Sequence, residues 1–288
     1  MYALYGIITA FVLNIANIFE MKEISEKRKN YTAIESFLMS TLVGLIIYTV
    51  FYLTLKESFT LNKYVFLYIF SWMFCNIIVF TMLSRINLVS LKVLDNLGLP
   101  ITFLLDLLSG TINLNKFSAA GYLIITTAVF ISIKRDKRLS IKNKESVIGL
   151  LLLILSLFLA SYSKVATYIL RTEYEFSTVS LLFSMSLIGS AVLFAILLSI
   201  RGFKPNNIKS NIKSHTKVGT LSVVQQAITV FTLGYIPASF LAIAMQAISY
   251  IVVPISKRSK DELVSDVDNK AHYYFIANFI GMLLVTLS

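Results

Sequence analysis

The chain alternates between long apolar runs and short polar, mostly basic segments. Each run is about 17–25 residues long, the length that an α-helix needs to cross the hydrocarbon core of a bilayer. The pattern therefore predicts an all-α integral membrane protein with ten transmembrane helices. The predicted spans are Tyr2–Phe19, Phe37–Leu55, Tyr64–Ser84, Asn87–Leu108, Phe117–Ile133, Val147–Leu170, Ser177–Ile200, Val218–Tyr235, Ala238–Ser256 and Ala271–Leu287.

Composition supports lipid as the solvent of this chain. Of its 288 residues, 57% are hydrophobic and 14% are charged, whereas soluble domains carry about 25% charged residues. The only cysteine is Cys75 and there are two histidines, so we predict no internal disulfide, no metal site within the membrane and no cofactor. No cleavable signal peptide is expected before the first apolar run.

The net charge of +11 is distributed unevenly between the two predicted faces of the membrane. Twenty of the 26 Lys and Arg residues lie in the odd-numbered connecting segments. The positive-inside rule places these segments in the cytoplasm and both chain termini outside, in a multi-pass protein of the cell membrane. It also explains the basic charge without nucleic acid as a partner. The even-numbered segments contain only Lys56, Lys63, Lys116 and Arg171.

The most basic segment, Lys134–Lys144, divides the chain into two halves, 1–140 and 141–288. Five predicted helices in each half would make the second half enter the membrane from the opposite side. Short sequence matches support a repeat, since Val79–Met82 resembles Val230–Leu233 and Pro100 corresponds to Pro254 at a similar offset. Two inverted five-helix repeats are a frequent construction of secondary transporters.

Several segments between the third and fifth predicted helices resemble the ten-helix drug/metabolite transporters. They are Asn96–Pro100, Leu107–Gly110 and Gly121–Ile125, with Thr111 at a position where members often carry Glu. The resemblance implies a central cavity lined by helices one, three, four, six, eight and nine. It also implies that helices five and ten are peripheral and support a homodimer.

Two polar triplets suggest where a substrate would bind. Each has the spacing i, i+3, i+4, which places its members on one helical face, and each precedes a proline at the same distance. In an inverted repeat the two faces would meet at the bilayer midplane. The predicted substrate-binding residues are Lys92, Asp95, Asn96, Gln246, Ser249 and Tyr250, with Asn14 and Asn17 on one face of the first helix.

Structural alternatives stay open for these residues. Lys92 and Asp95 can form an ion pair within their helix, and amides in membrane helices, such as those of Asn14 and Asn17, often only hydrogen-bond a neighbour. Asp106, at a helix end, is predicted to be solvated. Tyr2, Tyr5, Tyr64 and Tyr235 are predicted to belong to the interfacial aromatic belt.

The function predicted from these features is that of a secondary transporter, not an enzyme. It would move a small polar organic solute or metabolite by alternating access, with a coupling proton or other ion and with membrane lipid around it. A non-transporting accessory or immunity protein is one alternative. A membrane-embedded enzyme acting on lipid is another, although few acid–base residues are available to it.

Overall fold

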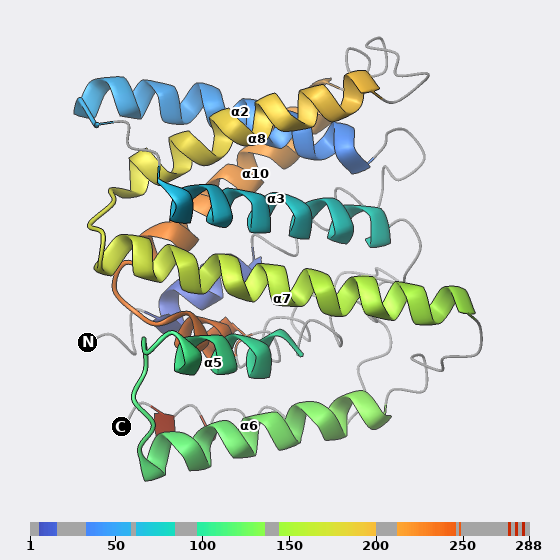
Figure 1. Cartoon of the computed structure of the whole chain (residues 1–288), viewed down its shortest axis with the longest axis vertical. Helices are drawn as coiled ribbons and strands as arrows, with labels where there is room; N and C mark the ends of the chain where they lie inside the picture. Colours follow the sequence, from blue (N-terminus) through green and yellow to red (C-terminus); the bar gives the residue numbers. More distant parts are fainter. Residues whose placement is uncertain are drawn as a thin grey trace.

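A computed structural model describes residues 6–15, 33–58, 62–83, 97–135, 144–199 and 212–245, together with 248, 276–277, 280–281 and 284–285. The described secondary structure is helical throughout (Figure 1). The described helices include Gly6–Ile15, α2 Ala33–Leu55, α3 Lys63–Leu83, α5 Gly98–Leu108, α6 Lys116–Arg135, α7 Lys144–Thr172, α8 Thr178–Ser199 and α10 Ile212–Thr232. A further helix, residues 238–245, follows α10 after a short turn.

The prediction of ten transmembrane helices, and of two inverted five-helix repeats derived from that count, is wrong. Within the described residues, three helices are long and apolar enough to cross a membrane: Phe37–Leu55, Leu151–Thr172 and Thr178–Ser199. Other apolar helices are shorter, such as Gly6–Ile15 and Gly98–Leu108. At 1.5 Å per residue such a helix is about 15 Å long, half of the hydrocarbon core. The predicted boundary between the halves, at residue 140, lies outside the described residues.

The outer surfaces of the three long helices are consistent with membrane association. Ile46 on α2 is 69% exposed, Leu151 on α7 is 61% exposed and Leu198 on α8 is 64% exposed. Exposed apolar side chains of this size gather in soluble proteins only at interaction surfaces. On helices of spanning length and composition, they match a lipid environment.

Small residues bring α2, α8 and α10 close together. A Cβ atom added at Gly44 would lie 2.8 Å from Ser186 Oγ, and one at Gly219 would lie 3.2 Å from Ser40 Cα. Lipid tails are as apolar as leucine, so membrane helices associate by close packing, and small residues permit it. These glycines therefore fix the distance between the three helices.

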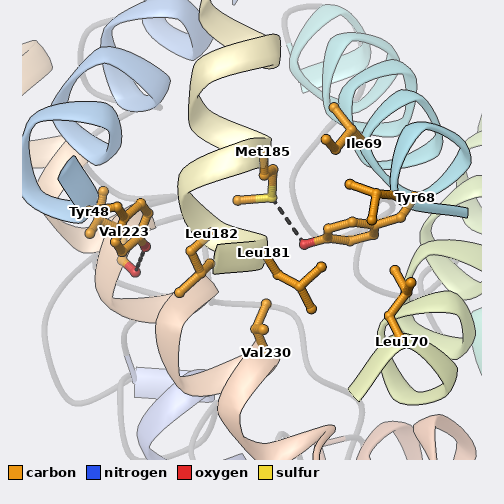
Figure 2. Packing of buried hydrophobic residues seen from close by; sticks show 10 residues of the cluster. Tyr48, Tyr68, Ile69, Leu170, Leu181, Leu182, Met185, Val223 and Val230 are labelled. Atoms are coloured by element: carbon orange, nitrogen blue, oxygen red, sulfur yellow. Dashed lines mark hydrogen bonds between the residues drawn. The ribbon is translucent and has the colours of Figure 1, made fainter. Parts of the chain in front are cut away.

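A buried cluster fills the space between these helices and α3. Tyr68 of α3 donates a hydrogen bond to Met185 Sδ of α8 at 3.1 Å, and Tyr48 of α2 donates to the carbonyl of Val223 of α10 at 2.8 Å (Figure 2). Each tyrosine hydroxyl thus has a partner in an otherwise apolar interior, as buried tyrosines require. The same cluster includes Leu170, near the C-terminal end of α7.

Helix α7 lies between α3 and α5, and α6 lies at the edge of the bundle beyond α5 (Figure 1). Thr102 of α5 donates to Ser161 Oγ of α7 at 2.8 Å, which joins two helices through small polar side chains. The turns after α2, α5, α7 and α10 share one end of the bundle. There Ser180 Oγ donates to the carbonyl of Ser58, and Tyr64 contacts Tyr174. We call this the loop end.

Candidate solute-binding cavity

Of the eight predicted substrate-binding residues, the structure describes only Asn14. Its side chain is buried, and its Nδ2 donates to the carbonyls of Ala10 at 2.9 Å and Met245 at 2.8 Å. The amide therefore ties the helix Gly6–Ile15 to helix 238–245. The other seven lie outside the described residues: Asn17, Lys92, Asp95, Asn96, Gln246, Ser249 and Tyr250.

The described part of the chain contains a cavity of about 410 Å³ at the loop end, between α3, α5 and α7. This volume lies in the range of about 300–1,000 Å³ that is usual for small-molecule sites. Most of its wall is aliphatic or aromatic, with a few polar groups. The lining residues are Tyr64, Leu105, Leu108, Ser109, Tyr162, Val165, Ala166, Ile169, Leu170, Glu173 and Tyr174.

The long wall of the cavity is one face of α7. Its lining positions, from Tyr162 through Ala166 and Ile169 to Glu173, are three or four residues apart, which is the spacing of a single helical face. The eleven steps from Tyr162 to Glu173 correspond to about 16 Å along the helix axis. The cavity is therefore elongated, with Tyr162 further into the bundle and Glu173 at the loop end.

Aromatic rings gather where the cavity reaches the loop end. The ring centroids of Tyr64 and Tyr174 are 5.1 Å apart, and Lys63 Nζ lies 5.1 Å from the Tyr64 centroid. This is cation–π distance. The carboxyl of Glu173 is exposed at the same end.

Among the described residues, the guanidinium nearest to the cavity is that of Arg171, and it contacts a different part of the molecule. Its position on α7 is two residues from Glu173, which places it on the far side of the helix. Its Nη1 donates to the carbonyl of Phe176, and its Nε and Nη2 would lie 2.9 Å from a Cβ added at Gly234. Gly234 thus leaves room for the guanidinium against the turn after α10, away from the cavity.

A buried polar network supports the cavity wall formed by α5. Asp106 is fully buried, so the prediction that it is solvated is wrong. Its Oδ2 accepts from the Ser239 backbone N–H at 2.6 Å, and its Oδ1 accepts from Thr111 Oγ1 at 2.8 Å. Tyr122 of α6 then donates to Ser239 Oγ at 2.8 Å. The carboxyl satisfies a first-turn amide of helix 238–245, which helix termini otherwise leave unpaired.

The turn after α5 explains why Thr111 reaches Asp106. Gly110 has φ +71°, and its N–H donates to the carbonyl of Leu107, while the Thr111 N–H donates to the carbonyl of Asp106. These two bonds with a left-handed glycine form a Schellman motif. The motif folds Thr111 back beside the Asp106 side chain.

Sequence reasoning missed most of the cavity. Tyr64 was predicted to be an interfacial belt residue, and Tyr162 and Glu173 were not selected. The signal for the last two is a tyrosine within an apolar helix and a carboxylate just beyond its end, eleven residues apart and so on the same helical face. Tyr64 and Ser109 reach the cavity only through tertiary packing, so no local pattern marks them.

Comparison with known proteins supplies a fold but no family. No family model matches the chain, and no curated protein matches its sequence. A solved structure described only as a crystal structure of a protein is similar, with 14% sequence identity and a TM-score of 0.71. The similarity covers 99% of this chain and 96% of the other. The two chains therefore share a fold over nearly their whole lengths.

Proposed function

We propose that the chain is a membrane transporter of a small organic solute, and that the cavity between α3, α5 and α7 binds this solute. The observation that carries the proposal is the cavity itself, which has the volume of a small-molecule site and combines apolar walls with a few polar groups at one end. It lies in a bundle whose three longest apolar helices suit a bilayer. A solute bound between membrane helices can enter from one face of the membrane and leave at the other.

Transport by alternating access requires the cavity to exchange its opening between the two membrane faces. The wall of α5 is held to helix 238–245 by Asp106 and to α7 by the bond between Thr102 and Ser161. Helix α7 also packs against the cluster of α3 and α8. Separation of α5 from α7 near the loop end, beyond the Thr102–Ser161 bond, would change the opening, with a proton or other ion as a coupling partner.

Filling the cavity should abolish solute binding. Ala166 lies in the middle of the α7 wall, so Ala166→Trp places an indole ring inside the cavity. A ligand at a hundred times its Kd stabilises a native protein by about 2.7 kcal/mol. In a melting-temperature screen against anionic, neutral and cationic organic solutes, we expect at least one to stabilise the wild type and not Ala166→Trp.

Two further variants control this screen. Ala195→Trp makes the same change at an exposed position of α8 and should respond as the wild type does. Leu108→Trp narrows the cavity from its exposed rim, where Leu108 is 74% exposed, and should weaken binding without disturbing the core. A solute that stabilises all four proteins equally would contradict binding in the cavity.

Orientation in the cell membrane is also part of the proposal. Because Lys134–Lys144 is the most basic segment of the chain, we propose a multi-pass chain in which this segment is cytoplasmic and both termini are external. The loop end then faces outward. Reporter fusions at Lys137 and Ser288 should report a cytoplasmic and an external location respectively, and a cytoplasmic signal from Ser288 would overturn this orientation.

A further inference from the structure

We propose that the solute is an amphipathic organic cation, whose charged end lies near Glu173 and whose apolar end extends towards Tyr162. The inference rests on the proposed function and specifies its substrate class. Among the described residues, the cavity lining contains three tyrosines and one carboxylate, and neither lysine nor arginine. A solute of positive charge therefore finds an opposite charge in the described lining, and one of negative charge does not.

The elongated shape of the cavity separates an end that carries the Glu173 carboxylate from an uncharged end at Tyr162. Glu173, Tyr174 and Tyr64 lie at the loop end, where the Tyr64 and Tyr174 rings are 5.1 Å apart. Along the rest of the wall, Val165, Ile169 and Leu105 belong to one hydrophobic cluster. A ligand with a cationic head and an aromatic or aliphatic tail matches this division, since burying the tail contributes about 25 cal/mol per Å² of apolar surface.

A cation of the protein already lies against one ring of the aromatic pair. Lys63 Nζ lies 5.1 Å from the centroid of the Tyr64 ring. The attraction of an ammonium to a tyrosine face is about 0.5–1 kcal/mol at exposed sites and greater where water is excluded. Lys63 therefore competes with a bound cation by its charge, and it identifies this corner as favourable for cations.

The surrounding charge at the loop end permits cation binding despite the net charge of +11. Its described basic residues are Lys56, Lys63, Lys116 and Arg171, and its described exposed or half-exposed acids are Glu57, Glu173 and Glu175. Arg171 is drawn to the Phe176 carbonyl on the other side of α7. Lys63 is thus the base nearest to the cavity mouth, and its removal should strengthen binding.

Equilibrium binding of radiolabelled N-methyl-phenylpyridinium to the wild-type protein in lipid nanodiscs tests the substrate class. Its uncharged parent phenylpyridine, at a pH where it carries no proton, is the matched neutral ligand. We expect the cation to bind and Glu173→Gln to weaken it by about tenfold, because a facing charge is lost. Glu175→Gln, two residues further along the chain and outside the lining, should leave the affinity unchanged.

Lys63→Gln should change the affinity in the opposite direction. We expect the affinity for the cation to rise about threefold and the affinity for the neutral ligand to stay the same. Opposite effects of Glu173→Gln and Lys63→Gln cannot arise from a general loss of folding. The substrate class would be overturned if the cation and its parent bind equally well and neither variant changes their affinity. If Ala166→Trp still abolishes that binding, the cavity remains a solute site. Binding that survives in Ala166→Trp, or no specific binding of either ligand, would contradict the substrate class; only if the solute screen also fails does the proposed function fall.

Discussion

Replacing Asp106 with alanine should lower the free energy of unfolding by about 3–5 kcal/mol. The substitution removes the acceptor of the Ser239 N–H and one of the two acceptors of the half-buried Thr111 hydroxyl, which keeps its bond to the Asp106 carbonyl. The Ser239 N–H left without a partner costs about 1–3 kcal/mol, and the missing carboxyl of the fully buried Asp106 leaves a void. The unfolding midpoint of the purified protein in detergent measures the effect.

Thr111→Val is the matched test of the network. It removes both hydrogen bonds that the Thr111 hydroxyl donates, one to the Asp106 carboxyl and one to the Asp106 carbonyl, and keeps the volume of the side chain nearly constant. We expect a loss of about 1 kcal/mol alone and a smaller loss when it is added to Asp106→Ala, because the bond to the carboxyl is then already absent. If Asp106→Ala unfolds at the wild-type midpoint, the carboxyl does not brace the α5 wall.

The second large effect is expected at Gly121, where α6 meets the chain near Gly281. A Cβ atom at Gly121 would lie 2.6 Å from the Gly281 carbonyl oxygen and 2.9 Å from Val285 Cγ2. A backbone oxygen cannot rotate away as a side chain can, so the two segments must separate. Gly121→Ala should therefore lower stability by about 1–3 kcal/mol, as other overpacked cores do.

The same change at Gly98 is the control. Its added Cβ would meet Leu157 at 3.6 Å, an ordinary contact, at the first position of α5. Alanine restricts the unfolded chain and favours the helix, so Gly98→Ala should leave stability unchanged or raise it by about 0.5–1 kcal/mol. Equal midpoints for the two variants would contradict the close approach at Gly121.

The hydrophobic pattern located the long helices well. The predicted span Phe37–Leu55 is identical to the spanning part of α2, and Ser177–Ile200 differs by one residue at each end from Thr178–Ser199. These runs are almost free of charge, so hydropathy and helix length agree. In other parts of the chain, hydropathy and helix length disagree. Helix α6 begins at Lys116 and ends in Lys134 and Arg135, so it is long but less apolar. Averaged hydropathy therefore overestimated the number of spans.

The candidate site was harder to predict from the sequence than the long helices, for a physical reason. The polar triplets were selected for depth within single helices, whereas the cavity joins Tyr64, the end of α5 and one face of α7. Such a site exists only after helices distant in sequence have packed. Asp106 was misplaced for the same reason, since its partner Ser239 is 133 residues away. A carboxylate in the last turn of a helix opposes the helix dipole, which is itself a sign that a partner is needed.

Uptake of N-methyl-phenylpyridinium into proteoliposomes tests most directly whether the cavity is the pathway of a transporter. The account predicts time-dependent uptake that saturates with concentration, is lost in Ala166→Trp and is retained in Ala195→Trp. Transport of a neutral solute with the same dependence on Ala166 would keep the pathway and change the substrate class. Uptake by Ala166→Trp at the wild-type rate, or no uptake of any solute that binds the cavity, would contradict the account.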